Sequence, residues 1–140
     1  MKIGERLPTI DMLKSKLIIK QKNMSQQLKD RTKAFAVRVI KMCKEIPGGK
    51  IEDILVRQIV RSATSVGANY RSALRGRSTP DFISKLTIAE EEADETCYWL
   101  ELMQEIHLFP SNRLDPLLKE ATEIPAILTA SCKTAKLKKK

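Results

Sequence analysis

The stretch RSATSVGANYRSALRGRS, residues 61–78, combines small side chains with four arginines. This composition is compatible with a phosphate-binding loop or with a helix that other helices approach closely. A phosphate-binding loop of the GxxxxGK[ST] type follows a strand, and the sequence has neither that spacing nor a strand pattern. We therefore place the stretch in a helix, where Ala63, Gly67, Ala68 and Tyr70 are predicted to pack against a neighbouring helix.

Apolar residues recur at helical spacings on both sides of this stretch, and no segment alternates with a period of two. The pattern predicts helices over residues 27–46, 51–75 and 79–107, and from about 113 into the lysine-rich tail. The inward-facing residues expected in the second helix are Ile51, Ile54, Leu55, Ile59, Ala63, Val66 and Tyr70. Because the connections are short, consecutive helices should be antiparallel neighbours.

The expected fold is all-α, an antiparallel up-down-up-down four-helix bundle. The bundle should comprise residues 28–132, between a basic N-terminal segment, 1–27, and a lysine-rich tail, 133–140. Residues 9–23 favour an extra N-terminal helical segment. Pro125 lies inside the fourth predicted helix, where it is expected to bend the helix axis.

Charge is distributed unevenly along the chain, whose formal net charge is +9. Residues 1–27 carry +4 and residues 133–140 carry +5, so the segment between them is neutral. Within that segment, residues 28–78 carry +8 and residues 79–132 carry −8. The two halves are expected to face each other, and any basic surface that stays uncompensated would attract an anionic partner.

Basic side chains of the second helix and of the tail are the candidates for such a surface. Those of the helix share one face, because steps of three and four residues connect them. The candidate nucleic-acid-binding residues are Arg57, Arg61, Arg71, Arg75, Arg77, Lys133, Lys136, Lys138, Lys139 and Lys140. Contacts should go mainly to phosphates, since aromatic residues are scarce and no RNA-recognition motif is present.

The acidic segment AEEEADET, residues 89–96, lies opposite the arginine-rich helix if the chain turns near residue 77. Arg61 is then predicted to pair with Glu92 or Glu95, a contact that fixes how the two helices align. A di-metal site would need Glu-x-x-His pairs from two helices, and the single histidine of the chain is not preceded by glutamate at that spacing. We expect neither a metal site nor a cofactor.

No catalytic constellation is evident in the sequence. A serine nucleophile needs a base, and the chain has one histidine and no GxSxG motif. Cys97 and Cys132 lie on apolar stripes, and three widely spaced cysteines without a CxxC pair favour the cytoplasm. The longest apolar runs are too short for a membrane span. We expect a non-enzymatic cytoplasmic protein.

Three motifs carry a resemblance to a known family: SVGANYR (65–71), DFISKL (81–86) and EEADETCYWL (91–100). They resemble the 23S rRNA intervening-sequence proteins, also called S23 ribosomal proteins, and looser similarity extends from about Leu28 to Lys133. The resemblance implies an antiparallel bundle, a homopentameric ring and no enzymatic activity. It also implies a relation to the accessory variability determinant of diversity-generating retroelements, which binds nucleic acid and a reverse transcriptase.

Two classes of function are therefore expected. The first is an oligomeric nucleic-acid-binding or ribonucleoprotein accessory protein, with RNA or DNA and a reverse transcriptase as candidate partners. The second is a purely structural oligomerisation bundle whose oppositely charged halves meet between subunits. Composition does not separate the two.

Overall fold

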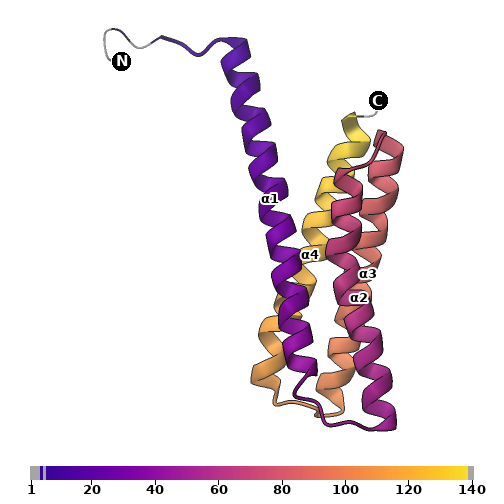
Figure 1. Ribbon diagram of the computed structural model, residues 1–140. Helices are drawn as coiled ribbons and strands as arrows, with labels where there is room; N and C mark the ends of the chain where they lie inside the picture. Colours follow the sequence, from indigo (N-terminus) through magenta and orange to yellow (C-terminus); the bar gives the residue numbers. More distant parts are fainter. Residues whose placement is uncertain (1–3, 5, 139–140) are drawn as a thin grey trace.

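In the computed structural model, which describes residues 4 and 6–138, the chain forms four helices (Figure 1). They are α1 (Ile10–Cys43), α2 (Lys50–Leu74), α3 (Thr79–Glu105) and α4 (Ser111–Lys138). Successive helices run in opposite directions, which confirms the predicted all-α bundle. α2 packs on α3 and α3 on α4, whereas α1 packs mainly on α2 and touches α4 less extensively.

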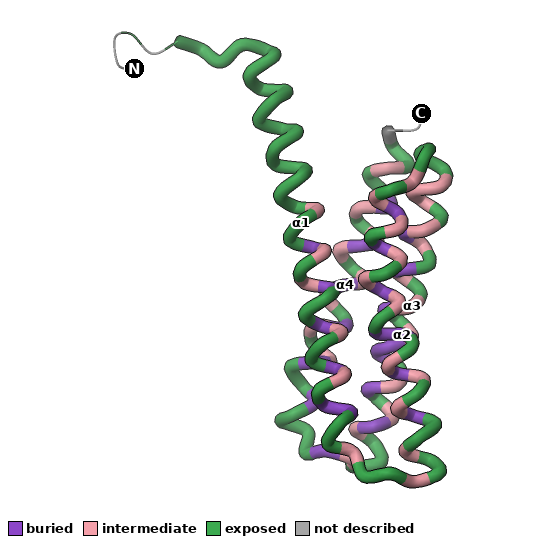
Figure 2. The backbone as a smooth tube through the Cα atoms, viewed as in Figure 1, coloured by how far each residue is buried: buried purple, intermediate pink, exposed green. Residues whose placement is uncertain are grey.

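α1 is much longer than the helix predicted over residues 27–46. The predicted N-terminal helical segment and the first bundle helix form one continuous helix of 34 residues, since neither glycine nor proline interrupts it. Thr9 caps this helix by accepting a hydrogen bond of 3.1 Å from the backbone N–H of Met12. The part before Leu28 extends past the bundle and is almost entirely exposed (Figure 2). We call residues 10–27 the N-terminal arm.

Residues 133–138, predicted as part of a tail, continue α4. α4 also runs through Pro125, which lacks the N–H that would donate to the carbonyl of Ala121. The thiol of Cys97, on α3, donates to that carbonyl at 3.0 Å. A neighbouring helix thus satisfies the acceptor that the proline leaves free, while the bend expected at Pro125 stays a prediction.

The bundle core is formed by one apolar stripe from each helix. Its largest fully buried side chains include Phe35, Ile59, Leu86, Leu100, Met103, Leu114, Ile124 and Leu128. The prediction that Ile51 and Ile54 face inward is wrong, because they are 66% and 55% exposed. Both lie in the first turns of α2 at the end of the bundle, and the inward stripe begins at Leu55.

α3 ends in a Schellman motif with a histidine where glycine is usual. The N–H of Leu108 donates to the carbonyl of Met103, and the N–H of His107 donates to that of Gln104, both at 3.1 Å. His107 takes the left-handed conformation that closes the motif, with φ of 57°. The only histidine of the sequence is therefore an exposed residue just after a helix end.

Replacing His107 with glycine should stabilise the protein by about 1 kcal/mol, because glycine has no Cβ to clash in the left-handed region. Urea unfolding of the His107→Gly variant measures the change. His107→Ala is the matched control, since alanine removes the imidazole but keeps the Cβ. An equal gain in both variants would contradict the conformational explanation.

Candidate nucleic-acid interface

Three of the predicted arginines lie at the end of α2 and in the connection to α3. Arg71, Arg75 and Arg77 are exposed, and none of them takes part in an ion pair within residues 4 and 6–138. The connection is tight at Gly76, where an added Cβ would lie 3.0 Å from both the carbonyl of Ala73 and a carboxylate oxygen of Asp81. The close packing of Ala73 and Asp81 around Gly76 keeps this turn compact, so Arg75 and Arg77 stay near each other.

The C-terminal part of α4 lies beside the same end of the bundle (Figure 1). The hydroxyl of Thr129 donates to Glu90 of α3 at 2.7 Å, and Cys132 Sγ lies 3.9 Å from the Thr87 hydroxyl. These contacts place Lys133 and the residues after it near the start of α3. The fold thus brings together two basic regions that are about 60 residues apart in the sequence.

We call this surface the basic end and define it as Arg71, Arg75, Arg77, Lys85, Lys133 and Lys136. Residues 71–85 and 132–137, which build this end of the bundle, contain these six basic side chains and a single acidic one, Asp81, and Glu90 of α3 lies about one turn further toward the middle. Lys138 follows at the end of α4, and the predicted residues Lys139 and Lys140 lie outside the described part of the chain. Lys85 was missed, because it stands alone in an acidic half of the sequence.

Arg61 does not belong to the basic end. Its guanidinium binds Glu92, with Nη1 3.0 Å from Oε2, and also binds Glu95, which confirms the predicted ion pairs between α2 and α3. The hydrogen bond from Arg61 lowers the pKa of the Glu95 carboxyl below its ordinary value, and the indole N–H of Trp99 contributes in the same direction. The charge of Arg61 is thus compensated within the bundle.

Arg57 is exposed but lies far from the arginines of the basic end. It precedes Arg71 by 14 residues in one continuous helix, which corresponds to about 21 Å along the axis. The arginines of α2 share one face of the helix, as predicted. They do not form one continuous uncompensated surface, because Arg61 is paired and Arg57 lies apart from Arg71 and Arg75.

The four residues predicted to pack against a neighbouring helix lie in two different environments. Ala63 and Tyr70 are buried as predicted, and an added Cβ at Gly67 would lie 3.1 Å from the hydroxyl oxygen of Thr32 on α1. The prediction that Ala68 packs against a helix is wrong, because it is exposed. Ala68 lies one position past the contact with α1, on the same outer face as Arg61 and Arg71.

Polar side chains are also used inside the bundle. The buried Thr96 hydroxyl donates to that of Ser62 at 2.8 Å, and Ser62 donates to the carbonyl of Ile59 at 3.2 Å. This link joins α2 to α3 in the middle of the core. Tyr70 is buried, and burial raises its pKa. These groups are satisfied structural elements rather than reactive ones.

Ion pairs to α4 hold α1 and the turn that follows it, and no local sequence pattern predicts them. Arg31 binds Glu120 through Nε at 2.6 Å and also binds Glu123. Glu45, just after α1, and Arg113, in the first turn of α4, form a second pair. The paired residues are separated by 68 to 92 positions, so only the relative alignment of the first and last helices reveals them.

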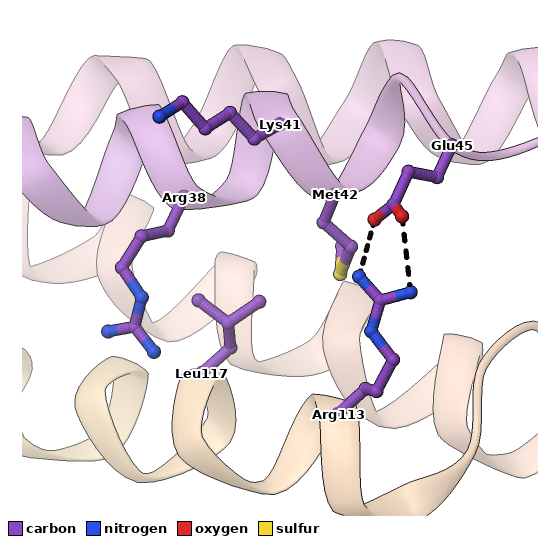
Figure 3. Close-up of a pocket in the computed structure, with 6 residues that line it drawn as sticks. All are labelled: Arg38, Lys41, Met42, Glu45, Arg113 and Leu117. Carbon is purple, nitrogen blue, oxygen red and sulfur yellow. Dashed lines mark hydrogen bonds and ion pairs between the residues drawn. The ribbon is translucent and has the colours of Figure 1, made fainter.

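A small groove of about 220 Å³ lies between α1 and α4 beside this second pair (Figure 3). Its lining residues are Arg38, Lys41, Met42, Glu45, Arg113 and Leu117. Figure 3 shows the Arg113 guanidinium turned toward Glu45, whose carboxylate compensates its charge.

All three cysteines are buried free thiols, and burial raises the pKa of Cys43 and of Cys97 to about 11. Within the described ranges, no three His, Cys, Asp or Glu side chains are grouped so as to hold a metal ion. None of the helices formed by those residues has a stretch with the length and hydropathy required to cross a bilayer.

Comparison with known proteins gives a family and, among solved structures, a relative from the same family. The model of the 23S rRNA-intervening sequence proteins matches residues 24–130. A crystal structure at 1.70 Å of a protein of unknown function from the S23 ribosomal protein family of Bacteroides thetaiotaomicron VPI-5482 is 38% identical, with a TM-score of 0.73. The match covers 78% of this chain and 97% of the Bacteroides chain.

No protein with a curated description matches the sequence. The family match begins at Met24, so most of the N-terminal arm lies before it, whereas α2, α3 and most of α4 lie inside it. The three motifs in residues 65–100 fall on the helices that form the arginine and glutamate contacts of the bundle. The chain belongs to the 23S rRNA-intervening sequence protein family.

Proposed function

We propose that this protein is a non-enzymatic, homo-oligomeric bundle of the cytoplasm that binds nucleic acid through phosphate contacts at the basic end. The observation that carries the proposal is the gathering of six exposed or half-exposed basic side chains, with one carboxylate among them, at one end of the bundle. Arginine and lysine side chains without an acidic partner are the groups that release counterions from a phosphate backbone.

The chemistry of this surface favours contacts to the backbone over the reading of bases. The one aromatic side chain in residues 71–85 and 132–137, Phe82, is half-buried against the core, and stacking on aromatic rings is a main route to sequence-specific recognition of single-stranded RNA. The turn at Gly76 supplies no free helix N-terminus either, because the Ser78 hydroxyl caps α3 by accepting from the N–H of Asp81 at 3.2 Å. The affinity for nucleic acid should therefore depend strongly on salt concentration and only weakly on nucleotide sequence.

The family gives this proposal its biological setting. Family members are named for 23S rRNA intervening sequences. We extend to this chain the homopentameric ring, the relation to retroelement accessory proteins and the reverse transcriptase partner that the resemblance implies. In a ring, each copy would contribute one basic end, so weak single contacts would add through avidity.

The second candidate function is a structural oligomerisation bundle that binds no nucleic acid. The observation that favours it is a row of exposed carboxylates along α3, opposite in charge to the N-terminal arm. In this alternative the charged side chains form contacts only between copies of the chain and do not bind nucleic acid.

A salt-titrated binding assay separates the two functions. The full chain, tested against 23S rRNA fragments and duplex DNA of equal length, should bind both, with a log affinity that falls linearly with log salt. A slope between about −4 and −6 is expected if most of the six basic side chains each contact one phosphate. Absence of binding at low salt would favour the structural bundle.

A further inference from the structure

The N-terminal arm continues the apolar core stripe of α1 into solvent. Its residues Ile10, Leu13, Leu17 and Met24 precede Leu28, the first buried residue of α1, at steps of three, four, seven and four. They therefore lie on the same side of the helix as the core, yet they are 71%, 51%, 57% and 59% exposed. Figure 2 shows this part of α1 as exposed, away from the other helices. From Ile10 to Met24 the stripe is about 21 Å long.

This stripe has no helix packed over it within residues 4 and 6–138. α1 contacts α2 and α4 but not α3 within the described residues, and the arm projects past the ends of its neighbours. The groove of about 530 Å³ between the base of the arm and Leu74 is lined mainly by polar side chains of α1. A single helix of this length is marginally stable in water unless its apolar face is covered. The apolar stripe is therefore expected to pack against a surface that complements it.

The outer face of α3 is that surface. Six exposed residues follow one another along it at steps of three and four, and they are Ile88, Glu91, Asp94, Tyr98, Glu101 and Glu105. We call them the acidic stripe. None of its four carboxylates takes part in an ion pair within the described chain. It also exposes two apolar side chains, Ile88 at 37% and Tyr98 at 50%.

The arm and the acidic stripe match in charge and in length. Residues 10–27 contain four lysines and one aspartate, and Lys14 and Lys20 lie on either side of the apolar stripe of the arm. From Ile88 to Glu105 the acidic stripe is about 25 Å long, close to the length of the arm. The arm thus presents an apolar row between lysines, and the acidic stripe presents carboxylates around two apolar side chains.

We propose that the N-terminal arm of one copy packs on the acidic stripe of a second copy of this chain. The two surfaces cannot meet within one molecule, because α1 and α3 are not neighbours and α1 is a single continuous helix. Two unlike surfaces make a head-to-tail contact, which closes into a ring when the rotation allows it. The inference rests on the self-assembly in the proposed function and is independent of nucleic-acid binding.

Charge reversal tests the contact in the full chain. The Lys14→Glu/Lys20→Glu variant should assemble at least about tenfold more weakly, because like charges would face each other across the contact. Adding Glu91→Lys and Glu101→Lys to the same chain restores opposite charges and should restore the mass. Light scattering over a concentration series measures both, and failure of the four-substitution variant to recover, with circular dichroism unchanged, would overturn the pairing.

Apolar substitutions test the orientation of the arm. Leu13→Ser/Leu17→Ser removes two members of the apolar stripe and should weaken assembly. Met12→Ser/Ile19→Ser is the matched control, because these equally exposed residues lie roughly 130° away around the helix and should leave the mass unchanged. Equal effects of the two pairs would contradict a specific face.

The outcomes separate this inference from the proposed function. A full chain that stays monomeric at high micromolar concentration would overturn both the contact and the self-assembly. An oligomer that is insensitive to every arm variant would overturn the contact alone. If the arm variants lose binding to an rRNA fragment while their mass stays unchanged, the occupant of the arm is nucleic acid and the inference is wrong.

Discussion

Replacement of Gly67 with leucine should destabilise the protein by about 3 kcal/mol, which corresponds to a fall in melting temperature of about 10 °C. The Cβ alone would lie 3.1 Å from the hydroxyl oxygen of Thr32 and 3.5 Å from its Cβ. Thr32 cannot easily turn away, because it is fully buried and its hydroxyl donates to the carbonyl of Leu28 at 2.9 Å. The remaining atoms of leucine would push α1 away from α2.

Two variants control for this expectation in urea and thermal unfolding. Ala68→Leu enlarges the adjacent small residue on the exposed face and should change the free energy of unfolding by less than about 0.5 kcal/mol. Gly67→Ala should be close to neutral, because the tight contact with Thr32 is offset by a gain in helix propensity of about 1 kcal/mol. If Gly67→Leu melts like the parent protein, α1 and α2 do not depend on close approach at this position.

Loss of three arginines from the basic end should weaken nucleic-acid binding on the order of 100-fold at 0.1 M salt. In the Arg71→Gln/Arg75→Gln/Arg77→Gln variant, three potential phosphate contacts disappear, so the slope of log affinity against log salt should become shallower by roughly 2 to 3. Glutamine keeps a long polar side chain, and all three positions are exposed, so the fold should persist. Fluorescence anisotropy with a labelled rRNA fragment across a salt series measures both quantities.

The matched control removes the same formal charge from the other end of the bundle. Lys44, Lys50 and Arg57 are exposed, and Lys44→Gln/Lys50→Gln/Arg57→Gln should leave the salt slope almost unchanged. If both triple variants lose affinity equally, binding follows net charge rather than the basic end. If neither loses affinity, the phosphate contacts are made elsewhere and the proposed interface is wrong.

The individual elements of the fold could largely be predicted because their signals are local. The 3.6-residue spacing of apolar side chains, the Ser78 cap and the breakers in PGGK at 47–50 depend only on residues a few positions apart. The pairing of Arg61 with Glu92 and Glu95 was also predictable, since two antiparallel helices joined by a short turn fix which residues lie opposite each other. The errors at Ile51 and Ile54 came from treating a helix face as uniform along its length, whereas Ala68 was assigned to the packed face although it lies on the outer one.

Local sequence patterns are enough to establish that this chain is a helical bundle with a basic first half and an acidic second half. Which of the other charges are compensated follows from the packing of the helices, because the compensating contacts join residues far apart in the chain. Arg31 binds the carboxylates of α4, Glu45 binds Arg113, and the arginines near residue 75 join Lys133 at one end of the bundle. Local patterns set the helices, whereas their packing decides which charges remain for a partner.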